Sequence, residues 1–270
     1  MNKQYDIIII GDSPEGAKAL KQLATASQKL KIAFVSTSFK SSTTRDFLNV
    51  EYIKDTVALI DYRAQLFGCY LDSGVRLYCT HIIIASGLAY APFKVHGKTV
   101  PSVFNTYYDI PRTAKALPAV VVGRDTAAVR LALEVAKKYK IVYLCSDTFE
   151  LDCSEALNNK IAAVPNVVVL PNAIINKFCV TDNKLTTIEL SNYATLTCHA
   201  IFVKTAATPE TKFIPNNIVK KDANGYCIVS ESAESTLVPK CFVIGSAATK
   251  STAKQKNAMV DTILTELLEV

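Results

Sequence analysis

Hydrophobic and polar positions along the chain form a pattern that begins with a fully apolar run. Four isoleucines, Ile7 to Ile10, precede the turn Gly11-Asp-Ser-Pro-Glu-Gly16, and apolar residues at helical spacing then continue to about Gln28. Such a run is typical of a strand buried on both faces, as in a parallel sheet. The pattern predicts a strand, a glycine turn and a helix, the opening of a βαβ unit that holds a dinucleotide at the helix N-terminus.

The same order of elements returns in the second half of the chain. Residues 119–128 read Ala-Val-Val-Val-Gly-Arg-Asp-Thr-Ala-Ala, which again predicts a strand, a glycine turn and a helix start. Each half continues with a second strand, antiparallel strands and a short apolar closing strand, expected at 81–87 and 200–206. This repetition indicates one unit used twice. The predicted fold class is α/β, with two Rossmann-like dinucleotide-binding domains that each contain a parallel sheet and a β-meander.

Length and composition narrow the class of protein. A chain of 270 residues, half of them hydrophobic, can bury one large core or two smaller ones. No apolar run reaches membrane-spanning length and the start lacks the zones of a signal peptide, so we expect a soluble, cytoplasmic protein that binds no membrane. The net charge of +6 is spread along the chain and does not indicate nucleic acid binding. Eight cysteines without a Cys-x-x-Cys spacing predict neither a disulfide scaffold nor a metal site.

The order of the motifs resembles the flavoproteins with two dinucleotide-binding domains, most closely the low-molecular-weight thioredoxin reductases. The resemblance covers nearly the whole chain. It rests on short motifs in family order: Gly11–Gly16, Ile84-Ala-Ser-Gly87, Gly123–Ala128, Thr208-Pro-Glu-Thr211, Val238-Pro-Lys-Cys-Phe-Val-Ile-Gly245 and Lys254-Gln255. It implies a glutathione reductase-type fold, with a discontinuous FAD-binding domain at residues 1–104 and 209–270 and an inserted NAD(P)-binding domain at 105–208.

The resemblance also implies a cofactor site and an oligomer. The FAD contacts would come from the first glycine turn and from the chain after several strands: Gly11, Ser13, Gly16, Ser36, Ser86, Gly87, Gly245, Ser246, Lys254 and Gln255. The family's FAD domains commonly form two-fold contacts, so we expect a homodimer. The sequence identifies no general acid, base or nucleophile, and the catalytic residues stay unknown.

One functional feature of the family is missing from the sequence. The redox-active Cys-x-x-Cys should lie shortly before the second glycine turn, but residues 103–110 contain no cysteine. Disulfide exchange needs an attacking thiolate and a resolving thiol. Cys145 and Cys153 flank one loop, and the sequence leaves open whether they pair or stay two separate thiols. The chain is therefore not expected to be an ordinary thioredoxin reductase.

The NADPH site is also altered. Of its turn glycines only Gly123 is kept, and Asp125 reads as the N-cap of a structural helix. The arginines that many relatives use for a 2′-phosphate would follow Leu144, where this chain has no basic residue up to Glu150. NAD(P)H binding is therefore not expected.

The residues for FAD are partly kept and partly replaced. Ser36 or Thr37 stands where an acid should hold the ribose hydroxyls, and Gly245-Ser246 replaces the family's Gly-Asp. Lys254 and Gln255 are kept. The sequence thus supports two hypotheses. The first is a flavin-dependent oxidoreductase supplied by another donor, such as a small electron-transfer protein docking near Lys250, Lys254 and Lys256. The second is a non-catalytic relative that acts as a binding or regulatory module.

The first glycine turn carries its own capping residues. Ser13 is a favoured helix N-cap and Pro14 a favoured first helical residue. Asp12 and Glu15 add negative charge at the positive end of the helix dipole. We therefore predict a turn that is partly self-capped and opposes an anionic ligand.

Overall fold

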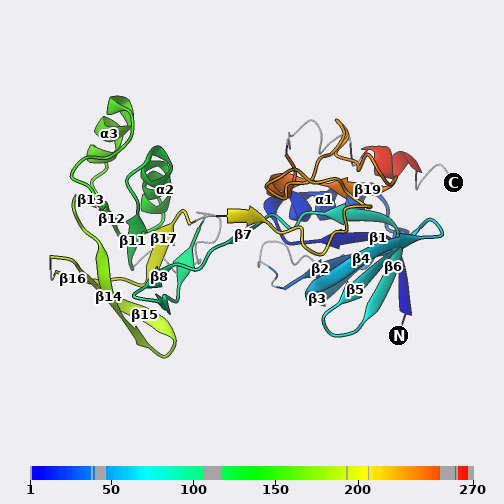
Figure 1. Ribbon diagram of the computed structural model, residues 1–270, viewed down its shortest axis with the longest axis horizontal. Coiled ribbons are helices and arrows are strands. Elements are labelled where there is room, and N and C mark those ends of the chain that lie inside the picture. The colour runs from blue at the N-terminus through cyan, green and yellow to red at the C-terminus, as the bar shows by residue number, and fades with distance from the viewer. Residues whose placement is uncertain are drawn as a thin grey trace. The chain divides into compact units, whose positions relative to one another are not determined.

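The computed structural model describes residues 2–37, 39, 47–105, 117–192, 194–205, 207–249, 259 and 261–266. The chain divides into two compact units, the first formed by Met1–Ala89 with Ala207–Val270 and the second by Tyr90–Ala206 (Figure 1). Residues 90–104, which the sequence assigned to the first domain, lie in the second unit. The reason is their packing, because Val95 and Val100 are buried in one cluster with Val120.

A parallel sheet forms the centre of the first unit. Its strands, in spatial order, are β3 (Val50–Lys54), β2 (Ile32–Ser36), β1 (Asn2–Ile10), β6 (Arg76–Ile84) and β19 (Cys241–Val243). Ile7 to Ile10 are at most 5% exposed, as expected for a strand buried on both faces.

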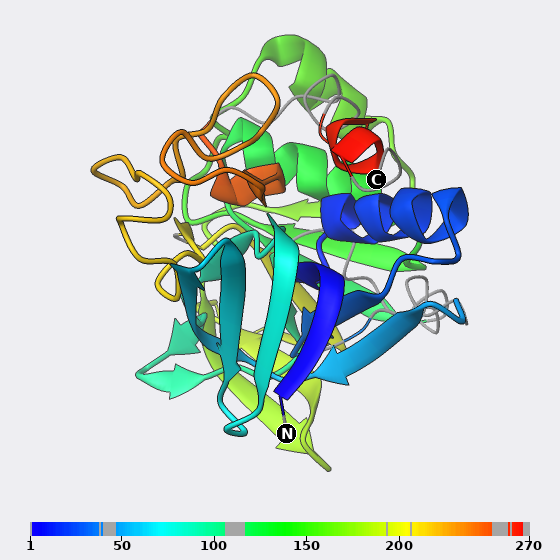
Figure 2. The ribbon, with the colours of Figure 1, turned by 90° about the vertical axis from the view of Figure 1, so that its right-hand side faces the viewer.

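Both faces of this sheet are covered. Figure 2 shows α1 (Pro14–Ala26) and the C-terminal helix (residues 261–266) on one face. There Leu20 and Leu23 of α1 and Ile263 share one buried cluster with Ile7 and Ile9 of β1. On the other face, side chains from the chain between residues 213 and 248 pack against Ile8, Ile10 and their neighbours.

The meander of the first unit differs in detail from the sequence-based expectation. The strands β4 (Val57–Arg63) and β5 (Leu66–Leu71) pair antiparallel with each other, and β5 pairs antiparallel with β6. The closing strand expected at 81–87 is part of a longer strand, β6, which begins at Arg76. Its first half pairs with β5 and its second half with β19, so one strand serves both the meander and the parallel sheet.

The second unit also consists of a parallel sheet, an antiparallel meander and helices. Its parallel sheet contains, in spatial order, β10 (Val103–Phe104), β17 (Ala200–Val203), β11 (Pro118–Val122), β12 (Ile141–Cys145) and β13 (Val167–Leu170). The antiparallel meander contains β14 (Ile175–Thr181), β15 (Lys184–Leu190) and β16 (Thr195–Thr197). The helices are α2 (Thr126–Ala136) and α3 (Glu155–Ala162). The hydrophobic pattern does not predict α3, because Ile161 is its single buried residue.

The remaining elements are short. They are β7 (Leu88–Tyr90), which pairs with β18 (Ala207–Pro209), the hairpin of β8 (Lys94–Val95) and β9 (Lys98–Thr99), and the 3₁₀ turn η3 (Gly245–Ala247). Among the described residues, no helix is long and apolar enough to cross a membrane.

Candidate functional site

The first glycine turn is shaped by close backbone packing. Gly11 has φ +100°, and a Cβ on it would lie 2.4 Å from the carbonyl oxygen of Ala85. A Cβ on Gly16 would lie 2.5 Å from the carbonyl oxygen of Gly11. Heavy atoms cannot approach so closely, so both positions need glycine for the contact of β1, α1 and the end of β6. The folded backbone alone therefore explains these two glycines, with or without a ligand.

Ser13 caps the helix that follows this turn. Its side-chain oxygen accepts a hydrogen bond from the Gly16 N–H at 3.1 Å, and Pro14, at the first helical position, has no N–H to offer. The predicted self-capping by Ser13 is confirmed. An anion at this helix N-terminus would compete with the Ser13 hydroxyl for the Gly16 N–H.

Three segments of the first unit meet beyond the carboxyl ends of β1, β6 and β19. Gly11 follows β1, Ser86 and Gly87 follow β6, and Gly245 lies just after β19. This edge of a parallel sheet is where α/β proteins bind ligands. A Cβ on Gly87, at φ +72°, would have no atom within 4 Å, so the backbone there faces open space.

An acidic side chain lies at the same edge. A Cβ on Gly245 would be 3.3 Å from Oε2 of Glu15, so the Glu15 carboxylate reaches from the first turn of α1 to η3. Ser246 is exposed in η3, while the Ser86 hydroxyl donates a hydrogen bond to the Glu210 carbonyl oxygen at 2.6 Å. Lys254 and Gln255 lie outside the described residues.

Sequence reasoning missed an acid next to Ser36. Ser36 ends β2, and its carbonyl oxygen accepts a hydrogen bond from the Asp55 N–H at 3.0 Å. The Asp55 carboxylate is hydrogen-bonded to Ser73 and to the Thr56 N–H, and these bonds lower its pKa. The sequence signal for Asp55 was an acidic residue directly after a strand. Its place at this edge of the sheet follows only from the pairing of β2 with β3.

The glycine turn of the second unit is closed by its own side chains. Asp125 caps α2, accepting a hydrogen bond from the Ala128 N–H at 2.8 Å, so the predicted structural cap is confirmed. The loop after β12 folds onto the turn. The Asp152 N–H donates to the Arg124 carbonyl oxygen at 2.8 Å, and Asp147 forms an ion pair with the Arg124 side chain. Acidic groups therefore lie at the N-terminus of α2, where negative charge opposes the binding of an anion.

The cysteines form no dithiol. All eight are free, and Cys145 and Cys153 belong to different buried clusters of the second unit. Burial raises the pKa of the Cys145 thiol to about 12, which removes its reactive thiolate form at neutral pH. Among the described residues, no group of His, Cys, Asp and Glu could hold a metal ion.

Two of the three histidines, His81 and His96, lie within hydrogen-bonding distance of neighbouring side chains. His81 is 1% exposed on β6, with Nε2 3.0 Å from Glu266 of the C-terminal helix and Nδ1 2.9 Å from the Thr80 hydroxyl. His96 lies near Asn176 at 3.2 Å in the second unit. His81 therefore links the C-terminal helix to the sheet.

Two Rossmann-like units, each with a glycine turn before a helix, define a protein with two dinucleotide-binding-type domains. The chain belongs to the pyridine nucleotide-disulphide oxidoreductase family, whose model matches residues 10–245. The fold is that of solved thioredoxin reductases at low sequence identity. The structure from Lactococcus lactis (FR conformation) is 15% identical with a TM-score of 0.66, and the match covers 98% of this chain and 100% of that one.

Two further structures have the same fold. The thioredoxin reductase of Streptococcus pyogenes MGAS5005 is 17% identical with a TM-score of 0.64, and the match covers 100% of both chains. That of T. acidophilum is 16% identical with a TM-score of 0.65, covering 98% of this chain and 97% of that one. No curated protein sequence matches the chain.

Proposed function

We propose that this chain is a flavin-dependent oxidoreductase related to the thioredoxin reductases, without the redox dithiol and supplied with electrons by a donor other than NAD(P)H. The observation that carries the proposal is the difference between the carboxyl edges of the two parallel sheets. In the first unit, Gly87 after β6 faces open space at this edge. In the second unit, the loop after β12 folds onto the glycine turn that Asp125 caps.

FAD would then bind in the first unit. The backbone of Gly11, Gly16, Gly87 and Gly245 would lie along the cofactor, with Ser13, Ser36, Ser86 and Ser246 as polar neighbours and Lys254 with Gln255 as further contacts. When bound, the flavin would supply the redox chemistry. The protein's own residues would bind the flavin and leave it accessible to the electron donor.

The donor in this proposal is a small electron-transfer protein that docks near Lys250, Lys254 and Lys256, which lie outside the described residues. The proposal also includes a homodimer formed through the first unit. Light scattering over micromolar concentrations tests the dimer. A monomer mass throughout would contradict it.

A second candidate function is favoured by the Ser13 cap and by the Glu15 carboxylate beside Gly245. Both occupy positions that a cofactor phosphate would use, which fits a non-catalytic relative that keeps the fold as a binding or regulatory module.

The visible spectrum of the purified protein separates the two functions. A yellow protein that releases FAD on denaturation supports the oxidoreductase. A colourless, folded protein that takes up no added FAD supports the binding module and contradicts the first proposal. In either case, we expect no NADPH-dependent reduction of thioredoxin. Turnover above roughly 1 per second in a coupled assay would overturn that expectation.

A further inference from the structure

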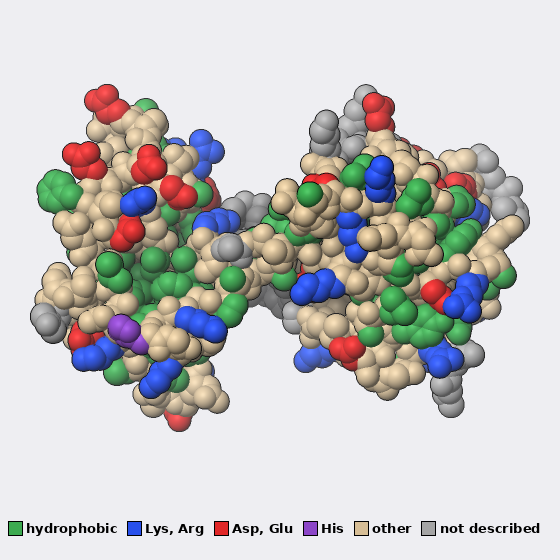
Figure 3. Space-filling view, in the orientation of Figure 1, with side chains coloured by type: hydrophobic (Ala, Val, Ile, Leu, Met, Phe, Trp, Pro, Cys, Tyr) green, Lys and Arg blue, Asp and Glu red, His purple; other side chains and the backbone are tan. Residues whose placement is uncertain are grey.

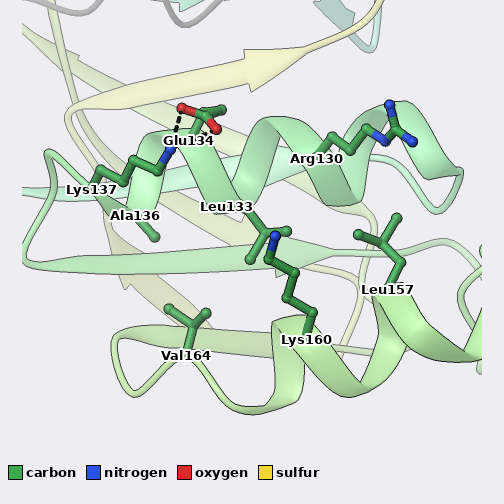
Figure 4. Close-up of a pocket in the computed structure, with 8 residues that line it drawn as sticks. All are labelled: Arg130, Leu133, Glu134, Ala136, Lys137, Leu157, Lys160 and Val164. Carbon is green, nitrogen blue, oxygen red and sulfur yellow. Dashed lines mark hydrogen bonds and ion pairs between the residues drawn. The ribbon is translucent and has the colours of Figure 1, made fainter.

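The second unit carries a groove between α2 and α3. The groove has a volume of about 630 Å³. Leu133 and Ala136 of α2 face Leu157 and Val164 across it, and these apolar side chains form its floor (Figure 4). The groove is thus large enough for an aromatic side chain together with its neighbours.

The rim of the groove is basic. Arg130 on α2 and Lys160 on α3 both line it. Lys160 points across toward α2, whereas the Arg130 side chain extends away from α3 (Figure 4). Lys137 forms an ion pair with Glu134 at 2.7 Å. In the described part of the chain, no acidic partner forms an ion pair with Arg130 or Lys160. The groove therefore fits a ligand with an apolar anchor and flanking negative charges.

The same unit also carries a protruding segment with those properties. Phe149, in the loop between β12 and α3, has 75% of its surface exposed. Asp147, Glu150 and Asp152 around it are also exposed. Acidic side chains gather at one end of the second unit (Figure 3). Because Phe149 is so exposed, it does not fill the groove of its own chain. An exposed aromatic residue among charges is a common anchor of protein contacts.

We propose that the occupant of the groove is a second copy of this chain, which inserts Phe149 and its acidic neighbours between α2 and α3. The phenyl ring would contact the apolar floor, and the carboxylates of Glu150 and Asp152 would face Arg130 and Lys160 of the other copy. The loop that carries Phe149 and the groove are different surfaces, so each copy offers its loop to one neighbour and its groove to another. The contact is therefore heterologous, and repeated insertion continues into a chain.

Self-association of the full chain tests this contact by analytical ultracentrifugation. A patch of this size predicts a weak complex, with a Kd of about 0.1 mM to 1 mM. Its opposite charges predict that the mass rises when salt is lowered from about 500 mM to about 20 mM. That salt-dependent rise, above the mass at high salt, reports the groove contact separately from any homodimer through the first unit.

Two variants remove the two halves of the contact. Phe149→Ala removes the inserted phenyl ring, and Arg130→Glu with Lys160→Glu reverses the charges at the rim of the groove. Each is expected to weaken the salt-dependent association about 10-fold or more. All three side chains are exposed, so folding should be kept, and circular dichroism checks it. Matched controls in the same unit, Ile174→Ala and Lys98→Glu with Lys184→Glu, should associate like the wild type.

Mixing the two variants is the decisive step. Phe149→Ala retains an intact groove, and the charge-reversed variant retains Phe149. An equimolar mixture should therefore associate within about 3-fold of the wild-type affinity, although neither variant does so alone. The proposal is overturned if the wild type shows no salt-dependent association, if the variants associate like the controls, or if the mixture restores nothing. Association of the mixture would also assign the groove to self-contact rather than to another acidic ligand.

Discussion

The side-chain oxygen of Ser13 lies 3.1 Å from the backbone nitrogen of Gly16, within the glycine turn between β1 and α1. The chain itself thus satisfies a donor that an anionic ligand would otherwise engage. Glu15 adds a carboxylate beside Gly245. The first turn is stabilised without a ligand, and any FAD must bind against these groups.

Replacing these groups should lower the stability of the ligand-free protein and raise its affinity for FAD. We expect Ser13→Ala to lower the free energy of unfolding by about 1 kcal/mol, because a helix cap is lost. The triple change Asp12→Gly, Ser13→Gly and Glu15→Ala should tighten FAD binding by about 3- to 30-fold, because two negative charges leave the helix N-terminus. Titration calorimetry on wild type and triple variant measures it. Equal or weaker affinity in the variant would mean that these side chains do not oppose the cofactor.

Gly11 should be far less tolerant of a methyl group than another glycine with positive φ. In Gly11→Ala the new Cβ would meet the Ala85 carbonyl oxygen, and we expect a loss of roughly 3 kcal/mol or more in unfolding free energy. Gly74→Ala is the matched control. Gly74 has φ +84° but open space around a Cβ, so the cost should be about 1 kcal/mol of backbone strain. Urea titrations compare the two, and similar losses would contradict the packing argument.

The thiols should differ sharply in reactivity. Cys179 is exposed and Cys153 half-buried, whereas the other six are buried. Burial raises the pKa of Cys69, Cys145 and Cys198 to about 12, so they carry almost no thiolate at neutral pH. Native protein should therefore label rapidly at Cys179 and more slowly at Cys153, with the rest reacting only after denaturation. Mass spectrometry of Cys179→Ser checks the assignment. Rapid labelling of Cys145 in the native protein would be inconsistent with this structure.

Stability should fall as the pH falls, in part through His81. Burial and the nearby Lys240 lower its pKa, and the hydrogen bond with Glu266 and the charge of Asp6 act in the opposite direction without cancelling the shift. Because the folded-state pKa lies below the unfolded value near 6.5, the unfolded chain binds the proton more readily. The stabilising contribution is complete above that value and is lost as the pH falls through the folded pKa.

His81→Gln keeps a polar side chain but cannot titrate. Denaturant unfolding at about pH 7.5 and about pH 5 should show a smaller loss of stability in this variant than in the wild type. His96→Gln is the control, since His96 is exposed in the second unit. An identical pH dependence in wild type and His81→Gln would show that His81 makes no contribution.

Local chemistry allowed much of the architecture to be predicted. The isoleucines of β1 are apolar without interruption because both faces of their sheet are covered, and this fixed the strand and its parallel class. Ser13 and Asp125 were predicted as caps because a cap depends on neighbouring residues in the chain, three positions apart in both turns. The absence of Cys-x-x-Cys is likewise a property of the sequence alone.

Contacts between residues far apart in the sequence could be identified only from the tertiary structure. β6 begins earlier than the closing strand expected at 81–87 because its first half pairs with β5, while its second half pairs with β19. Asp55 reaches Ser36 through strand pairing, Glu15 reaches Gly245 by the packing of α1 on η3, and Asp152 meets Arg124 by loop closure. The sequence by itself thus determined the repeated βαβ units and their self-capped helices, since these follow from residues within a few positions. Only the folded chain decided which distant groups meet at each glycine turn, because packing rather than sequence spacing brings them together across tens of residues.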